Sequence, residues 1–83
     1  MKVQAVICGE LYEFTNYVKH ISGKSPEAKV TILHGGAVII DGTKYVAVTK
    51  IDDTRGVYFD SVKRVSFNVP YNIINAAINR VRT

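Results

Sequence analysis

Few residues in this chain have the types and the spacing that catalysis requires. Cys8 precedes Gly9 at a predicted strand-to-helix turn, where a helix N-terminus can lower the pKa of a thiol. A nucleophile also needs a general base and an oxyanion site, and neither histidine, His20 or His34, forms a known motif with Cys8. We therefore interpret Cys8 as a small core residue and expect a protein that is not an enzyme. A cysteine-dependent activity at Cys8 is the alternative.

No group of residues has the spacing of a metal or phosphate site. Asp52 and Asp53 are paired acids in a predicted turn, where such residues favour the turn itself. Gly35 and Gly36 lack the strand and helix context of a phosphate-binding glycine loop. We therefore expect no metal and no cofactor.

The positive charge of the chain is concentrated in its C-terminal half. The net charge is +4, the charges of positions 1–43 cancel, and no acidic residue follows Asp60. This asymmetry indicates an anionic partner, with nucleic acid as the first choice. Tyr58 lies among basic residues, an arrangement that holds single-stranded nucleic acid by stacking and charge, although a half-buried sheet tyrosine is the alternative. The candidate partner-binding residues are Arg55, Tyr58, Lys63, Arg64, Asn75, Asn79, Arg80 and Arg82.

The last segment predicts an amphipathic helix. Asn68 is its expected N-cap, and Pro70 is tolerated in its first turn. Isoleucine, alanine and valine form a broad apolar stripe at helical spacing, and the opposite face carries Asn75, Asn79 and Arg80. Such side chains contact bases and phosphates. The alternative for the asparagines is the codon bias of an AT-rich genome.

The hydrophobic pattern predicts an α+β fold. We expect a small, mainly antiparallel sheet of four to five strands with two helices, in the order β-α-β-β-β-β-α. The apolar run of residues 3–8 indicates the first strand, and residues 29–34 indicate the second. Between them, a helix begins near Glu10 and ends with an expected left-handed cap at Gly23.

The segment before the last helix is harder to assign. Residues 57–60 indicate a strand, and a break or bulge is expected at residues 61–63, because continuous alternation would bury Lys63. Alternation then resumes, with Val65 and Phe67 predicted on one face.

Residues 37–51 predict a β-hairpin. Two β-prone runs flank Asp41 and Gly42, which is a strong signal for a two-residue turn. Both arms are apolar on both faces, and we expect both helices to cover the same face. The second face then needs a partner, such as a second copy of the chain. The two faces are predicted as Val38, Ile40 and Tyr45 on one side and Ile39, Val46 and Val48 on the other.

The segment order α-β-β-β-α from Glu10 onward resembles that of the double-stranded-RNA-binding domain. That family carries a basic motif at the start of its last helix, whereas residues 70–77 here contain no Lys or Arg. The resemblance therefore implies an order of elements, and no residue role is carried over from it.

Size and composition set the functional hypotheses. We expect a single domain over residues 1–83. One cysteine, no apolar run of membrane-spanning length and no secretory signal predict a cytoplasmic protein without a membrane association. The first hypothesis is a small non-enzymatic binding protein for nucleic acid. The second is a protein-interaction module, either a homodimer or a small phage- or plasmid-type inhibitor of a larger host protein.

Overall fold

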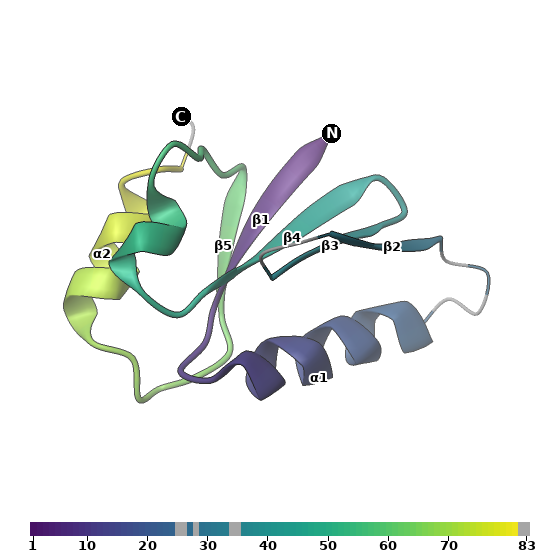
Figure 1. The fold of residues 1–83 in the computed structure, drawn as a ribbon, viewed down its shortest axis with the longest axis horizontal. Helices are drawn as coiled ribbons and strands as arrows, with labels where there is room; N and C mark the ends of the chain where they lie inside the picture. The colour runs from purple at the N-terminus through teal and green to yellow at the C-terminus, as the bar shows by residue number, and fades with distance from the viewer. Residues whose placement is uncertain (25–26, 28, 34–35, 82–83) are drawn as a thin grey trace.

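A five-stranded sheet forms the centre of the molecule, with strand order β2-β3-β4-β1-β5 (Figure 1). The computed structural model describes residues 1–24, 27, 29–33 and 36–81. The α+β class and the predicted order of elements are confirmed. The elements are β1 (Lys2–Ile7), α1 (Leu11–Gly23), β2 (Val30–Leu33), β3 (Ala37–Ile40), β4 (Thr43–Val48), the 3-10 helix η1 (Ile51–Thr54), β5 (Ser61–Arg64) and α2 (Tyr71–Ile78).

The sheet is mixed rather than mainly antiparallel, which corrects the prediction. β1 is parallel to β4 on one side and to β5 on the other, whereas β3 is antiparallel to both β2 and β4. Ala5, Val6, Ile7 and Cys8 are all fully buried. A strand covered on both faces between parallel neighbours has a near-continuous apolar sequence, which explains the run at residues 3–8.

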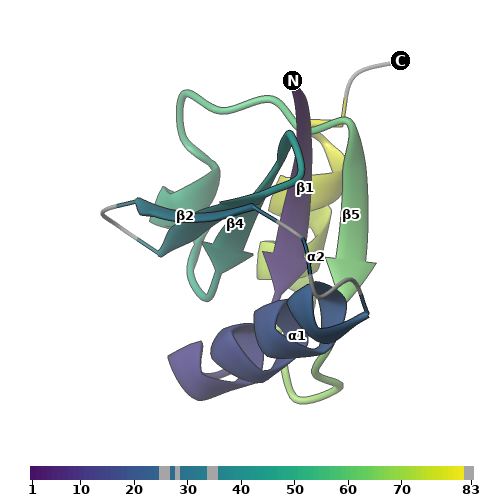
Figure 2. The same cartoon turned by 90° about the vertical axis from the view of Figure 1, so that its right-hand side faces the viewer.

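The two helices lie on opposite faces of the sheet, not on the same face as expected (Figures 1 and 2). Alternate residues of a strand point to opposite faces, and β1 divides accordingly. Val6 packs with Phe14 and Val18 of α1, whereas Ile7 packs with Ile74 of α2. Each face of the central strand therefore has its own helix.

The hairpin is confirmed in detail. Asp41 and Gly42 have φ values of 48° and 83°, as a type I′ turn requires. Val38 pairs with Tyr45 and contributes to the α1 side of the core, whereas Val48 is fully buried on the α2 side. Val48 and the half-buried Val46 thus pack in the cluster that contains Ile74 and Ala77 of α2, so the second face of β4 is not left open as expected.

The first helix begins as its sequence suggests but ends differently. A carboxylate oxygen of Glu13 accepts hydrogen bonds from the N–H groups of Gly9 (2.9 Å) and Glu10 (2.8 Å), which satisfies two donors at the helix N-terminus. The predicted left-handed cap at Gly23 is wrong. Gly23 is the last helical residue, and Lys24 ends the helix in a right-handed conformation with its N–H donating to the Ile21 carbonyl.

The segment between η1 and α2 departs most from prediction. β5 occupies residues 61–64, including those assigned to a break, whereas Phe59 outside the strand forms only a bridge to Val81. Phe67, predicted to share a face with half-buried Val65, is 85% exposed. Pro70 rather than Asn68 is the N-cap of α2.

Candidate functional site

β5 is one edge of the sheet and carries two of the predicted partner-binding residues. The side chains of Lys63 and Arg64 are exposed there. Asp60 fixes the start of the strand, because its carboxylate accepts the Val3 N–H at 2.8 Å and its own N–H donates to the Val3 carbonyl at 2.7 Å. The Asp60 carboxylate, the negative charge nearest in sequence to this edge, is therefore hydrogen-bonded to the backbone of β1.

Tyr58 and Arg80 are brought together beyond the start of β5. The Arg80 guanidinium carbon lies 5.6 Å from the centroid of the Tyr58 ring, within the range of a cation–π contact. The Phe59 N–H donates to the Arg80 carbonyl at 2.8 Å, which holds the segment after α2 beside the segment before β5. Tyr58 remains 55% exposed. The sequence singled out both residues but gave no indication of this contact.

A second arginine–aromatic pair lies at the other end of β5. Arg64 donates to the carbonyls of Ser66 (2.9 Å) and Phe67 (3.1 Å), and its guanidinium carbon lies 5.2 Å from the Phe67 ring centroid. Phe67 was not predicted as a binding residue, because its spacing from Val65 indicated a shared buried face. Its position shortly after a basic pair, in a segment without acids, was the available signal.

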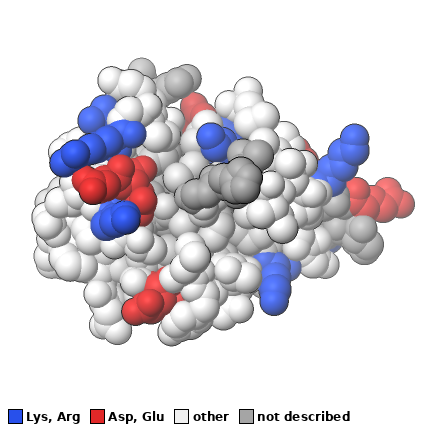
Figure 3. Space-filling model, in the orientation of Figure 1, with Lys and Arg blue, Asp and Glu red and all other residues white. Residues whose placement is uncertain are grey.

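The remaining predicted residues are less closely associated. Arg55 forms an exposed ion pair with Asp52 at 3.2 Å, so its charge is offset locally. Acidic and basic side chains are interspersed on the face of the molecule that includes η1 (Figure 3). Asn75 and Asn79 are exposed on α2. Arg82 lies outside the described residues, as do His34 and Gly35.

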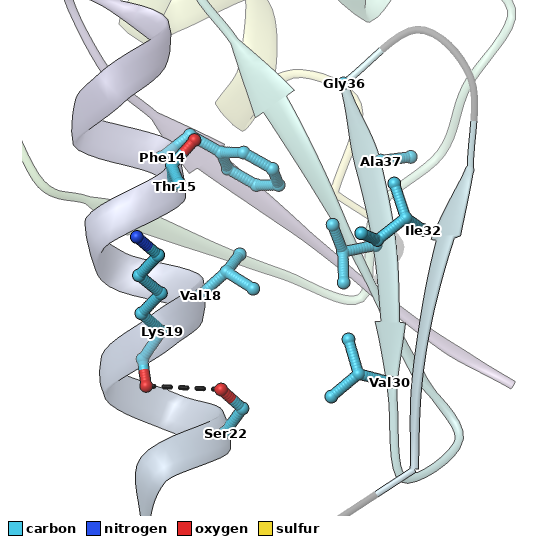
Figure 4. Close-up of a pocket in the computed structure, with 10 residues that line it drawn as sticks. Phe14, Thr15, Val18, Lys19, Ser22, Val30, Ile32, Gly36 and Ala37 are labelled. Carbon is cyan, nitrogen blue, oxygen red and sulfur yellow. Dashed lines mark hydrogen bonds between the residues drawn. The ribbon is translucent and has the colours of Figure 1, made fainter.

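A second surface feature, a groove of about 370 Å³ between α1 and the β2–β3 hairpin, was not predicted (Figure 4). Val30 and Ile32 of β2 pair with Ile40 and Val38 and share their face of the sheet, yet they are 46% and 80% exposed. α1 covers the sheet as far as β3 and leaves the apolar edge strand open. The groove is lined by Phe14, Thr15, Val18, Lys19, Ser22, Val30, Ile32, Gly36, Ala37 and Val38.

Cys8 has the properties of a core residue. It is fully buried, and burial raises the pKa of its thiol to about 11, with the nearby Glu13 carboxylate acting in the same direction. A higher pKa lowers the thiolate fraction on which nucleophilic attack depends. Among the described residues, no three His, Cys, Asp or Glu side chains gather to hold a metal ion. No described helix is long and apolar enough to cross a bilayer.

No family model, curated protein or solved structure matches this chain. The resemblance in segment order to the double-stranded-RNA-binding domain does not extend further, because β5 intervenes between β4 and α2.

Proposed function

We propose that this chain is a small, non-enzymatic, cytoplasmic protein that binds nucleic acid along the β5 edge. The observation that carries the proposal is the cationic edge formed by the exposed Lys63 and Arg64, with the half-buried Arg80 at its end, in a part of the chain without an acidic residue after Asp60. Lys63 and Arg64 are consecutive and point to opposite faces of the sheet, so an anionic polymer along this edge has a positive charge on either side of it, with Arg80 beyond the start of the strand. Asn75 and Asn79 on α2 are available as auxiliary polar groups.

Nucleic acid fits this edge better than an isolated anion does. The cations are spread over the length of a strand rather than gathered around one point, and two of them lie against exposed aromatic rings. Phosphate backbones are bound in this distributed way, with release of condensed counterions at each neutralised phosphate. Aromatic rings beside cations also suit unpaired bases.

The first prediction concerns the salt dependence of binding. The double variant Lys63→Gln, Arg80→Gln is expected to bind a labelled single strand more weakly, by roughly tenfold at 50 mM salt for each phosphate that is no longer neutralised. The slope of the logarithm of affinity against the logarithm of salt concentration should fall by roughly 0.7 for each such phosphate. Fluorescence anisotropy titrations at several salt concentrations measure both quantities.

The matched control is Lys24→Gln, Lys29→Gln, which removes the same charge from exposed positions before β2. It is expected to bind as the parent protein does. Equal losses of affinity in the two double variants would mean that net charge alone, and not the β5 edge, determines binding. An absence of salt-sensitive binding to both DNA and RNA at low ionic strength would refute the proposal.

The second candidate function is a protein-interaction module, favoured by the open groove beside β2. β2 is the other edge strand of the sheet, and its sequence Val-Thr-Ile-Leu contains no charge, proline or glycine. Uncharged edge strands pair readily with further strands, whereas charged residues such as Lys63 and Arg64 protect the β5 edge. Pairing of β2 with β2 of a second copy brings no like charges together, because the strand is uncharged. It also uses the same edge of both copies and therefore stops at a dimer, whereas pairing of β2 with β5 of another copy could continue from copy to copy.

This candidate predicts that Ile32→Lys disrupts self-association. Ile32 is 80% exposed, so the lysine is tolerated in the monomer but opposes strand addition across the edge. Light scattering after size exclusion should then find a dimer for the parent and a monomer for the variant. Ile78→Lys, at a 52% exposed position of α2, should remain dimeric. A parent protein that is monomeric at every concentration tested argues against the homodimer.

A further inference from the structure

The two aromatic rings at the ends of β5 share an arrangement that the fold does not require. Tyr58 and Phe67 are 55% and 85% exposed, so neither ring contributes a full hydrophobic contact to the core. Each ring instead lies against an arginine guanidinium, at 5.6 Å for Arg80 and 5.2 Å for Arg64. An aromatic ring supported from one side by a cation and otherwise open to solvent can stack with another planar group.

The loop that carries Phe67 is ordered by hydrogen bonds of its own. Arg64 donates to the Ser66 and Phe67 carbonyls, and the buried Ser66 hydroxyl oxygen accepts the Asn68 N–H at 3.3 Å. These bonds order the turn after β5 while the ring points away from the core. The backbone that carries the ring is therefore ordered before any ligand arrives, which lowers the entropy cost of binding.

The opposite ring is held by different means. The hydrogen bond from the Phe59 N–H to the Arg80 carbonyl and the bridge of Phe59 to Val81 fix the two segments that carry Tyr58 and Arg80. Phe59 itself is fully buried, which anchors Tyr58 next to it. Both rings are thus attached to rigid parts of the fold.

The distance between the rings sets the size of the ligand. β5 has four residues and at about 3.3 Å per residue spans roughly 13 Å, with the rings lying beyond its two ends. A strand whose bases stay stacked rises about 3.4 Å per nucleotide, so roughly four stacked nucleotides span β5, and a more extended strand spans it with fewer. Site sizes of this order are common for single-strand-binding surfaces.

We propose that Tyr58 and Phe67 are stacking platforms for unpaired bases of a single strand that runs along β5, with Arg80 and Arg64 supporting the rings and Lys63 contacting the backbone between them. This inference rests on the proposed function and specifies its ligand. The bases of double-stranded nucleic acid cannot stack on the two rings, because they are already stacked within the duplex.

The test compares Tyr58→Ala and Phe67→Ala with the parent protein in anisotropy titrations against labelled twelve-nucleotide oligothymidylate. Each variant is expected to bind roughly 5- to 150-fold more weakly, since one base no longer stacks on a ring. The salt slope should stay unchanged because no cation is removed. Tyr71→Ala, at an exposed aromatic position at the start of α2, is the control expected to have no effect.

A further probe separates stacking from charge. An abasic strand of the same length should bind the parent and Phe67→Ala equally. If Tyr58→Ala and Phe67→Ala retain parental affinity for the oligothymidylate while binding remains salt-sensitive, the two rings do not stack on bases. The proposal that the protein binds nucleic acid is then unaffected. If the parent shows no salt-sensitive binding, both proposals fail.

Discussion

Replacing Phe59 with alanine is expected to remove a large part of the stability of the fold. Phe59 is the largest of the fully buried side chains, and it packs in the α2-side cluster with Ile7, Val48 and Ala77. Truncation of a buried phenylalanine costs about 3–5 kcal/mol, because the favourable transfer free energy disappears and a cavity remains. At the stability per residue typical of globular proteins, a chain of 83 residues has an unfolding free energy of only about 4–12 kcal/mol.

Thermal unfolding followed by circular dichroism measures this effect. The melting temperature of Phe59→Ala should fall by roughly 15 °C or more, at the shift per kcal/mol typical of small domains. The matched control is Phe67→Ala, which makes the same substitution at an 85% exposed ring and should cost less than about 1 kcal/mol. Equal destabilisation by the two variants would contradict the assignment of Phe59 to the core and of Phe67 to the surface.

Local patterns predicted the elements whose signals are contained in a few neighbouring residues. The Asp41–Gly42 turn requires two positive φ values, which few residue pairs adopt, so its position and the two faces of its hairpin followed directly. α1 was equally readable, because Phe14 and Val18 repeat at helical spacing and acidic residues precede them. These features depend little on the rest of the fold.

Strand pairing was not predictable in the same way. Residues 3–8 form a continuous apolar run, which fits a strand buried on both faces, but the partners of such a strand lie far along the chain. Nothing local distinguishes a parallel β1–β4 pair from an antiparallel one. The placement of α2 on the opposite face follows from this pairing, because Ile7 and Val6 each need a different cover.

For the candidate site, the sequence predicted which residues take part but not how they are arranged. The excess of cations after Asp60 identified Lys63, Arg64 and Arg80 without indicating which aromatic rings they would contact. Phe67 was assigned to a buried face because strand alternation was extended past Arg64, where the strand ends. The ion pair of Arg55 with Asp52 depends on η1, which was predicted only as a turn.

The position of α2 on the second face of the sheet leads to a further prediction. Ile74 is 9% exposed and packs in the α2-side cluster with Ile7 and Val48, whereas Ile78, one turn later on the same helix, is 52% exposed. Ile74→Asp places a carboxylate in an apolar layer, and an uncompensated buried charge costs about 3–5 kcal/mol. Ile78→Asp makes the same chemical change at a solvated position and should cost about 1 kcal/mol or less.

Urea unfolding of the two variants distinguishes the arrangement of the layers. The helix dipole disfavours a carboxylate at Ile78, the last residue of α2, more than at Ile74 near its start, so a larger loss of stability for Ile74→Asp reflects what the helix covers. Ile74→Asp should lower the unfolding midpoint far more than Ile78→Asp does. With α2 displaced, Val48 and the half-buried Val46 on the second face of β4 lose their cover, so this variant should also self-associate at concentrations where Ile78→Asp does not. Similar midpoints for the two variants would mean that α2 does not close this face, and a partner for the hairpin would again be required.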